Sequence, residues 1–126
     1  MESDKKSFNG KIIAESLLSP AVLKLVSIIS TKVIDLGENS STPWLKQWTI
    51  HTIKVSEANA LLVSAMLAKA LEPDRPWYID FKNDETHYII YVNKIFCVNR
   101  RNGELYKQAR EYGKKQGIPV AQLDFK

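Results

Sequence analysis

Hydrophobic and polar positions alternate along the second half of the chain in a pattern typical of an antiparallel sheet. Three runs alternate with a period of two, at residues 77–82, 86–92 and 95–99. Asn83-Asp84 and Asn93-Lys94 lie between these runs. Asn and Asp tolerate the left-handed backbone conformation that two-residue hairpin turns need. The pattern therefore predicts three short strands that follow one another as a meander.

β-Branched side chains dominate the apolar segments before residue 56. Residues 22–35 hold seven Val, Ile and Thr residues, and residues 44–55 form an aromatic and β-branched run. Both segments are predicted as strands, joined as a hairpin by a polar loop. The alternative for residues 22–35 is a helix, because Ser19, Pro20 and Gly37 match the residue types preferred at helix ends.

Two helices are predicted before the meander. Residues 57–71 are rich in Ala and Leu, follow Ser56 as a candidate N-cap and end before Pro73. Residues 11–18 predict a short N-terminal helix, closed by Pro20, because the residue before a proline avoids the helical region.

A last helix is predicted at residues 103–116. Asn102 is its candidate N-cap, and Gly117 matches a C-terminal stop. Its buried stripe is predicted at Leu105, Ala109 and Tyr112. The tail is expected to dock back on the domain through three apolar residues, Val120, Leu123 and Phe125.

These elements predict one α+β domain over residues 10–126, preceded by a disordered end at residues 1–9. Its order is β-β-α-β-β-β-α after the short N-terminal helix, with a mainly antiparallel sheet of about five strands and helices packed on one face. If residues 22–35 are helical, the order becomes β-α-β-β-β-α with a longer N-terminal helix. A chain of 126 residues fits one hydrophobic core of ordinary size.

The two predicted turns set a register that brings three charged or titratable side chains into one row. Asp80 lies opposite His87, and His87 lies opposite Arg100. A carboxylate beside an imidazole is how a general base is oriented, so this row is a candidate small-molecule or hydrolytic site. A solvated ladder of opposite charges explains the row as well, and the sequence favours that interpretation.

The same register sorts the meander into two faces. A core face for the helices holds Trp77, Ile79, Phe81, Tyr88, Ile90, Val92, Ile95 and Cys97. The other face has an apolar end with Tyr78, Ile89, Tyr91, Phe96 and Val98. An apolar patch of this kind usually marks a contact site. We therefore predict that a protein partner or a second copy binds there, through Tyr78, Tyr91 and Phe96.

Positive charge gathers near the C-terminus. The chain has a net charge of +4, whereas residues 94–126 carry eight Lys or Arg against three Asp or Glu, and hence +5. A basic patch is predicted at Arg100, Arg101, Lys107, Arg110 and Lys114. Nucleic acid is therefore the alternative partner, since such a stripe can contact phosphates, although a solvated helix face has the same pattern.

Several classes of protein are disfavoured. Cys97 is the only cysteine, so no intrachain disulfide can form, and a cytoplasmic location is expected. His51, His87 and Cys97 lack the spacing of zinc ligands, and no glycine-rich phosphate loop or nucleophile elbow occurs. We expect no metal, no cofactor and no membrane span. The sequence predicts a non-enzymatic interaction or accessory protein.

Overall fold

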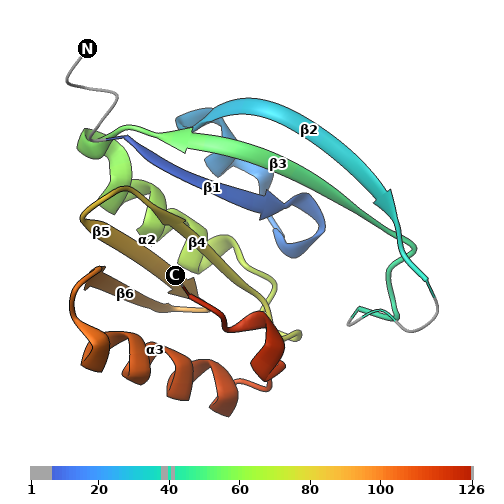
Figure 1. Cartoon of the computed structure of the whole chain (residues 1–126). Helices are drawn as coiled ribbons and strands as arrows, with labels where there is room; N and C mark the ends of the chain where they lie inside the picture. Colours follow the sequence, from blue (N-terminus) through green and yellow to red (C-terminus); the bar gives the residue numbers. More distant parts are fainter. Residues whose placement is uncertain (1–6, 38–39, 41, 126) are drawn as a thin grey trace.

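The computed structural model describes residues 7–37, 40 and 42–125. Six strands form one antiparallel sheet in the order β2-β3-β1-β4-β5-β6 (Figure 1). The strands are β1 (Phe8–Ile13), β2 (Ser27–Asp35), β3 (Gln47–Val55), β4 (Tyr78–Lys82), β5 (Thr86–Tyr91) and β6 (Lys94–Asn99). The helices are α2 (Ala60–Ala70), α3 (Gly103–Lys115) and four short 3₁₀ turns, η1 (Ala14–Ser16), η2 (Pro20–Leu25), η3 (Glu57–Asn59) and η4 (Val120–Gln122). The predicted α+β fold is confirmed, with one strand more than expected.

The additional strand, β1, lies in the middle of the sheet between β3 and β4. The predicted helix at residues 11–18 is therefore wrong, and the predicted disordered end at residues 1–9 runs too far, because β1 begins at Phe8. The first six residues lie outside the described part of the chain. Every second residue of β1, at Phe8, Gly10 and Ile12, lies on the same face of the sheet. This period of two is what a strand requires.

The hairpin of β2 and β3 confirms most of the strand predicted at residues 22–35. Its first part, Pro20–Leu25, forms η2 instead, with Pro20 at the first helical position. The alternative prediction of a helix therefore holds only for η2, and the predicted strand begins at Ser27. The hairpin extends beyond the end of β1 (Figure 1).

The two α-helices pack on opposite faces of the sheet, so the prediction of helices on one face is wrong. α2 shares a core with Ile79, Phe81 and Ile90. α3 shares a second core with Ile89, Tyr91 and Val98. Because neighbouring residues of a strand point to opposite faces, this division matches the two predicted faces of the meander.

The ends of α3 agree with the sequence, and its buried stripe is shifted. The Asn102 side chain accepts a hydrogen bond from the Leu105 amide at 3.1 Å, and Gly117 has a φ of 88°. The buried positions are Tyr106, Ala109 and Gly113, with Leu105 and Tyr112 half-buried beside them.

The tail after α3 docks as predicted for two of its three apolar residues. Leu123 and Phe125 are buried in the second core, whereas Val120 is 64% exposed. At the start of α2, the Ser56 side chain makes no cap hydrogen bond, and η3 leads into the helix instead.

Candidate functional site

The register of the meander differs from the prediction by two residues at each turn. Asp80 pairs with Ile89 instead of His87. His87 in turn pairs with Val98 instead of Arg100. A shift of two residues keeps every side chain on its predicted face, which is why the faces are right although the pairs are wrong.

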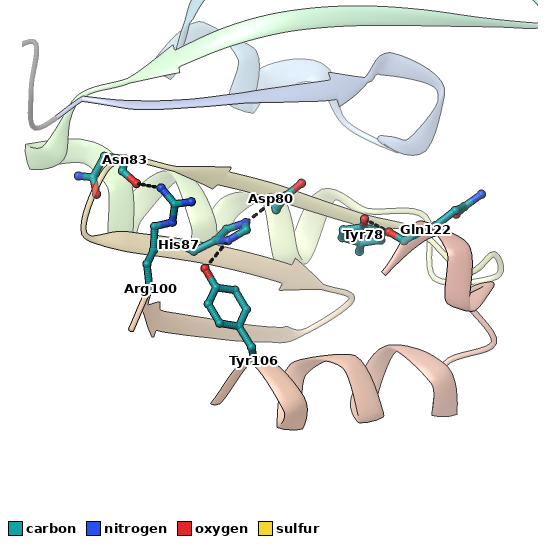
Figure 2. Close-up of polar contacts among 7 residues, drawn as sticks. All are labelled: Tyr78, Asp80, Asn83, His87, Arg100, Tyr106 and Gln122. Atoms are coloured by element: carbon teal, nitrogen blue, oxygen red, sulfur yellow. Dashed lines mark hydrogen bonds and ion pairs between the residues drawn. The ribbon is translucent and has the colours of Figure 1, made fainter. Parts of the chain in front are cut away.

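Asp80, His87 and Tyr106 nevertheless form a continuous hydrogen-bonded chain, which we call the Asp80 relay (Figure 2). Asp80 Oδ2 lies 2.6 Å from His87 Nε2, and His87 Nδ1 lies 2.9 Å from the Tyr106 hydroxyl. The first contact runs diagonally across β4 and β5, because Asp80 pairs with Ile89 and His87 lies two residues before Ile89. The relay joins two strands to α3.

Only the Asp80 end of the relay is substantially exposed. The Asp80 side chain is 37% exposed, Tyr106 is 8% exposed, and His87 is fully buried. An ionised carboxylate only accepts hydrogen bonds, so we assign the imidazole proton to Nε2, where it bonds to Asp80. The Tyr106 hydroxyl then donates to Nδ1. Both imidazole nitrogens are thus hydrogen-bonded, and Asp80 is the member of the relay that meets the surface.

Arg100 does not join this row, so the predicted Asp80, His87 and Arg100 arrangement is corrected. Arg100 Nη1 donates to the Asn83 carbonyl oxygen at 3.1 Å (Figure 2), and the neighbouring Arg101 is exposed. Tyr106 takes the place beyond His87. Sequence reasoning missed it, although its helical spacing from Ala109 and Gly113 was a usable signal.

Asp80 lies at the wall of a cavity of about 320 Å³, which we call the aromatic cavity. It opens on the face that carries α3, where side chains of β1 and β3 form its floor. Floor residues are Lys11, Ile13, Trp48 and Ile50. Walls are Trp44, Trp77, Tyr78, Pro119 and Gln122. The volume lies at the lower end of the range for small-molecule sites.

All three tryptophans of the chain line the aromatic cavity. Trp48 Nε1 donates to Thr42 Oγ1 at 2.8 Å. The ring of Trp44 meets that of Trp77 edge to face, with centroids 6.2 Å apart, and the Arg75 guanidinium lies 4.2 Å from the Trp44 ring centroid. These contacts hold the rings in place, so the cavity is preformed.

Three aromatic residues predicted as a binding face are covered in part by the chain itself. Tyr91 is buried, and its hydroxyl donates to the Ala109 carbonyl oxygen at 2.6 Å, while burial raises its pKa. Phe96 is half-buried against α3. Tyr78 donates to the Gln122 carbonyl oxygen, and burial, followed by nearby negative charge, raises its pKa as well, so it remains a donor at neutral pH.

Acidic residues interrupt the predicted basic patch on α3. Lys107 and Lys114 are exposed, and Arg110 is half-buried. Glu104 and Glu111 lie on the same helix, and Lys114 Nζ approaches Glu111 Oε1 to 3.8 Å. Exposed pairs of this kind contribute little to stability, but they lower the local positive charge.

The other candidate ligands are dispersed. His51 is half-buried, with Nδ1 2.8 Å from Thr31 Oγ1. Cys97, predicted in the core, is exposed on the edge strand β6, so that prediction is wrong. Within the described ranges, no three His, Cys, Asp or Glu residues are grouped to hold a metal ion. None of the helices described here combines the length and apolar character needed to cross a membrane.

Comparisons with models of known protein families, with curated proteins and with solved structures found no match to this chain. A fold by itself does not assign an activity. The function must therefore be argued from the side chains of the site.

Proposed function

We propose that this protein binds a small organic molecule in the aromatic cavity. The observation that carries the proposal is the position of Asp80, whose carboxylate is oriented by the buried His87 and presented at the wall of a preformed cavity. Small-molecule sites typically combine an apolar lining with a few well-held polar groups. Asp80 and the three tryptophans supply both parts.

Binding is better supported than catalysis. A general base must come within hydrogen-bond reach of its substrate, and His87 is fully buried with both nitrogens bonded. The Tyr78 hydroxyl at the cavity is likewise bonded to Gln122. We propose a cytoplasmic location for this binding protein, because the single Cys97 excludes an intrachain disulfide.

Tryptophan signals provide a direct test, because all three tryptophans line the cavity. A panel of small aromatic and aliphatic compounds is titrated into the protein, and the indole emission and indole N–H resonances are followed. Binding compounds should shift these signals. Ile50→Phe, which fills the floor, should weaken binding about tenfold. Leu61→Phe is the matched control, because Leu61 is 67% exposed on α2 across the sheet.

Two outcomes would contradict the proposal. In the first, no compound of the panel shifts an indole signal. In the second, the shifts are equally strong in Ile50→Phe, which would place the compounds outside the cavity.

Self-association through β2 is a second candidate function. β2 is an edge strand in which eight of nine residues are exposed, including Ile28, Ile29 and Val33. An antiparallel pair of β2 strands centred on Val33, beyond the bulge at Ile28–Ser30, would place the Val33 side chains of the two copies opposite each other, an apolar pairing that stabilises sheets. Light scattering should then give a dimer that Val33→Lys dissociates. A wild-type monomer at high concentration would remove this candidate.

The apolar sheet end, for which the sequence predicted a protein partner, is covered by α3 and the tail, and so supports this role less well than β2 does. Nucleic-acid binding by the α3 patch stays a prediction. It requires an affinity that falls steeply with salt.

A further inference from the structure

Four of the donors that line the aromatic cavity are engaged within the chain. The hydroxyls of Tyr78 and Ser16 donate to backbone carbonyl oxygens. The indole N–H groups of Trp48 and Trp77 donate to side-chain oxygens. A ligand that needed these donors would have to break an existing hydrogen bond. The lining therefore favours a ligand that brings its own donor.

Asp80 retains free acceptor capacity. A carboxylate offers about four lone-pair positions, and the hydrogen bond with His87 uses only Oδ2. Asp80 cannot turn away without leaving the His87 N–H unpaired in the interior, which is costly. The cavity thus holds a negatively charged acceptor in a set orientation.

The aromatic walls favour the same kind of partner. The faces of indole rings carry negative electrostatic potential and attract cations. Trp44 already holds the Arg75 guanidinium over its ring at 4.2 Å, which shows that the rim accommodates positive charge. Trp48 and Trp77 line the same cavity as Asp80.

Two groups would favour the opposite ligand charge, Arg75 over the Trp44 ring at the rim and Lys11 in the lining. The Arg75 guanidinium is already engaged with that ring. Lys11 pairs with Asp80 across β1 and β4. Its side chain is exposed, and its long stem can carry the ammonium group into water. The short Asp80 side chain is held by His87 and cannot move in this way. Asp80 is therefore the charged group of the lining that is held in one orientation.

We infer that the ligand is an organic amine, with a protonated nitrogen bound to Asp80 and an aromatic or apolar body among the tryptophans. Because this assignment names the ligand class of the same cavity, it rests on the proposed binding function. A cavity of about 320 Å³ restricts the amine to a small molecule.

Three probes of similar size and different charge test the inference: 2-phenylethylamine, 2-phenylethanol and phenylacetate. Each is titrated at neutral pH with indole emission and N–H resonances as the readout. The amine should bind about tenfold more tightly than the alcohol or the acid. Asp80→Asn, which keeps an oxygen acceptor for His87, should lower the amine affinity about tenfold and change the alcohol affinity less than about twofold.

Lys11→Gln on the neighbouring strand is a second test of ligand charge, and it also serves if Asp80→Asn does not fold. Because it removes a positive charge from the cavity lining, it should raise the amine affinity and lower that of phenylacetate. A fall of about tenfold in Lys11→Gln would contradict the inference.

Other outcomes separate the two proposals. Equal affinities for the amine and the alcohol, or tighter binding of phenylacetate, would overturn the amine assignment while keeping the cavity as a binding site. An amine affinity that survives Asp80→Asn would do the same. If no probe shifts an indole signal, the binding function and the amine assignment both fail.

Discussion

Replacing Gly10 with Ala should force the two halves of the sheet apart. Gly10 lies opposite Phe81, in the middle of the three residue pairs that join β1 to β4. A Cβ atom at this position would lie 2.4 Å from the Asp80 carbonyl oxygen and 2.8 Å from Phe81 Cβ. Because such contacts are not found below 3.0 Å, the strands must separate by about 0.6 Å.

The expected loss is about 2–4 kcal/mol in the free energy of unfolding. Overpacking of a filled interior costs about 1–3 kcal/mol, and each weakened backbone hydrogen bond adds about 1 kcal/mol. Neither atom can rotate away, since one belongs to the backbone and the other is a Cβ. Ala also restricts the conformations of the unfolded chain, which offsets about 0.5–1 kcal/mol of this loss in the free energy of unfolding.

Urea unfolding followed by circular dichroism measures this effect. Gly103→Ala is the control, because a Cβ atom there meets nothing within 4 Å, and its free energy of unfolding should change by less than about 0.5 kcal/mol. Equal urea midpoints for the two variants would refute the close approach of β1 to β4, and with it the central position of β1.

Two further predictions concern polar contacts. Tyr106→Phe removes the donor to His87 Nδ1 and should lower the free energy of unfolding, measured in urea, by about 1–2 kcal/mol. Tyr112→Phe, on the half-buried side of the same helix, is the control. An equal loss of stability in Tyr112→Phe would contradict a specific role of the Tyr106 hydroxyl. Partial burial tends to raise the pKa of Glu15, but hydrogen bonds from the Thr49 amide and hydroxyl, at 2.7 and 2.8 Å, outweigh it, so the pKa is lowered. The free energy of unfolding of wild type should exceed that of Glu15→Gln by about 0.5–1 kcal/mol after solvent screening. This difference should be present above pH 4.5 and vanish as the pH falls through the lowered pKa of Glu15. A difference that persists in stronger acid would contradict this prediction.

Local patterns were sufficient for the faces of the meander and for the ends of α3. Alternation with a period of two places Ile79 and Tyr78 on opposite faces of the sheet, and this holds for any pairing register. It cannot detect a slip of two residues, and Asn93 illustrates the reason. Asn93 adopts the predicted left-handed conformation, with a φ of 56°, yet it is the second residue of its turn and not the first.

Non-local pairing explains what the sequence did not reveal. The apolar spacing of residues 11–18 fits a helix as well as a strand, and the choice depends on β3 and β4, far along the chain. The aromatic cavity depends on the same pairing, since Lys11, Trp48 and Asp80 meet only when β1 lies between β3 and β4. Of its residues, sequence reasoning proposed Tyr78 and Asp80 for a site and missed the tryptophans.

The most direct test of the central claim is an isotope-filtered NOE experiment on the protein saturated with 2-phenylethylamine. The ring protons should show NOEs to the indoles of Trp44 and Trp48, and the methylene next to the nitrogen should lie near Asp80. NOEs confined to the exposed leucines of α2, or spread over the surface, would contradict a ligand site in the aromatic cavity.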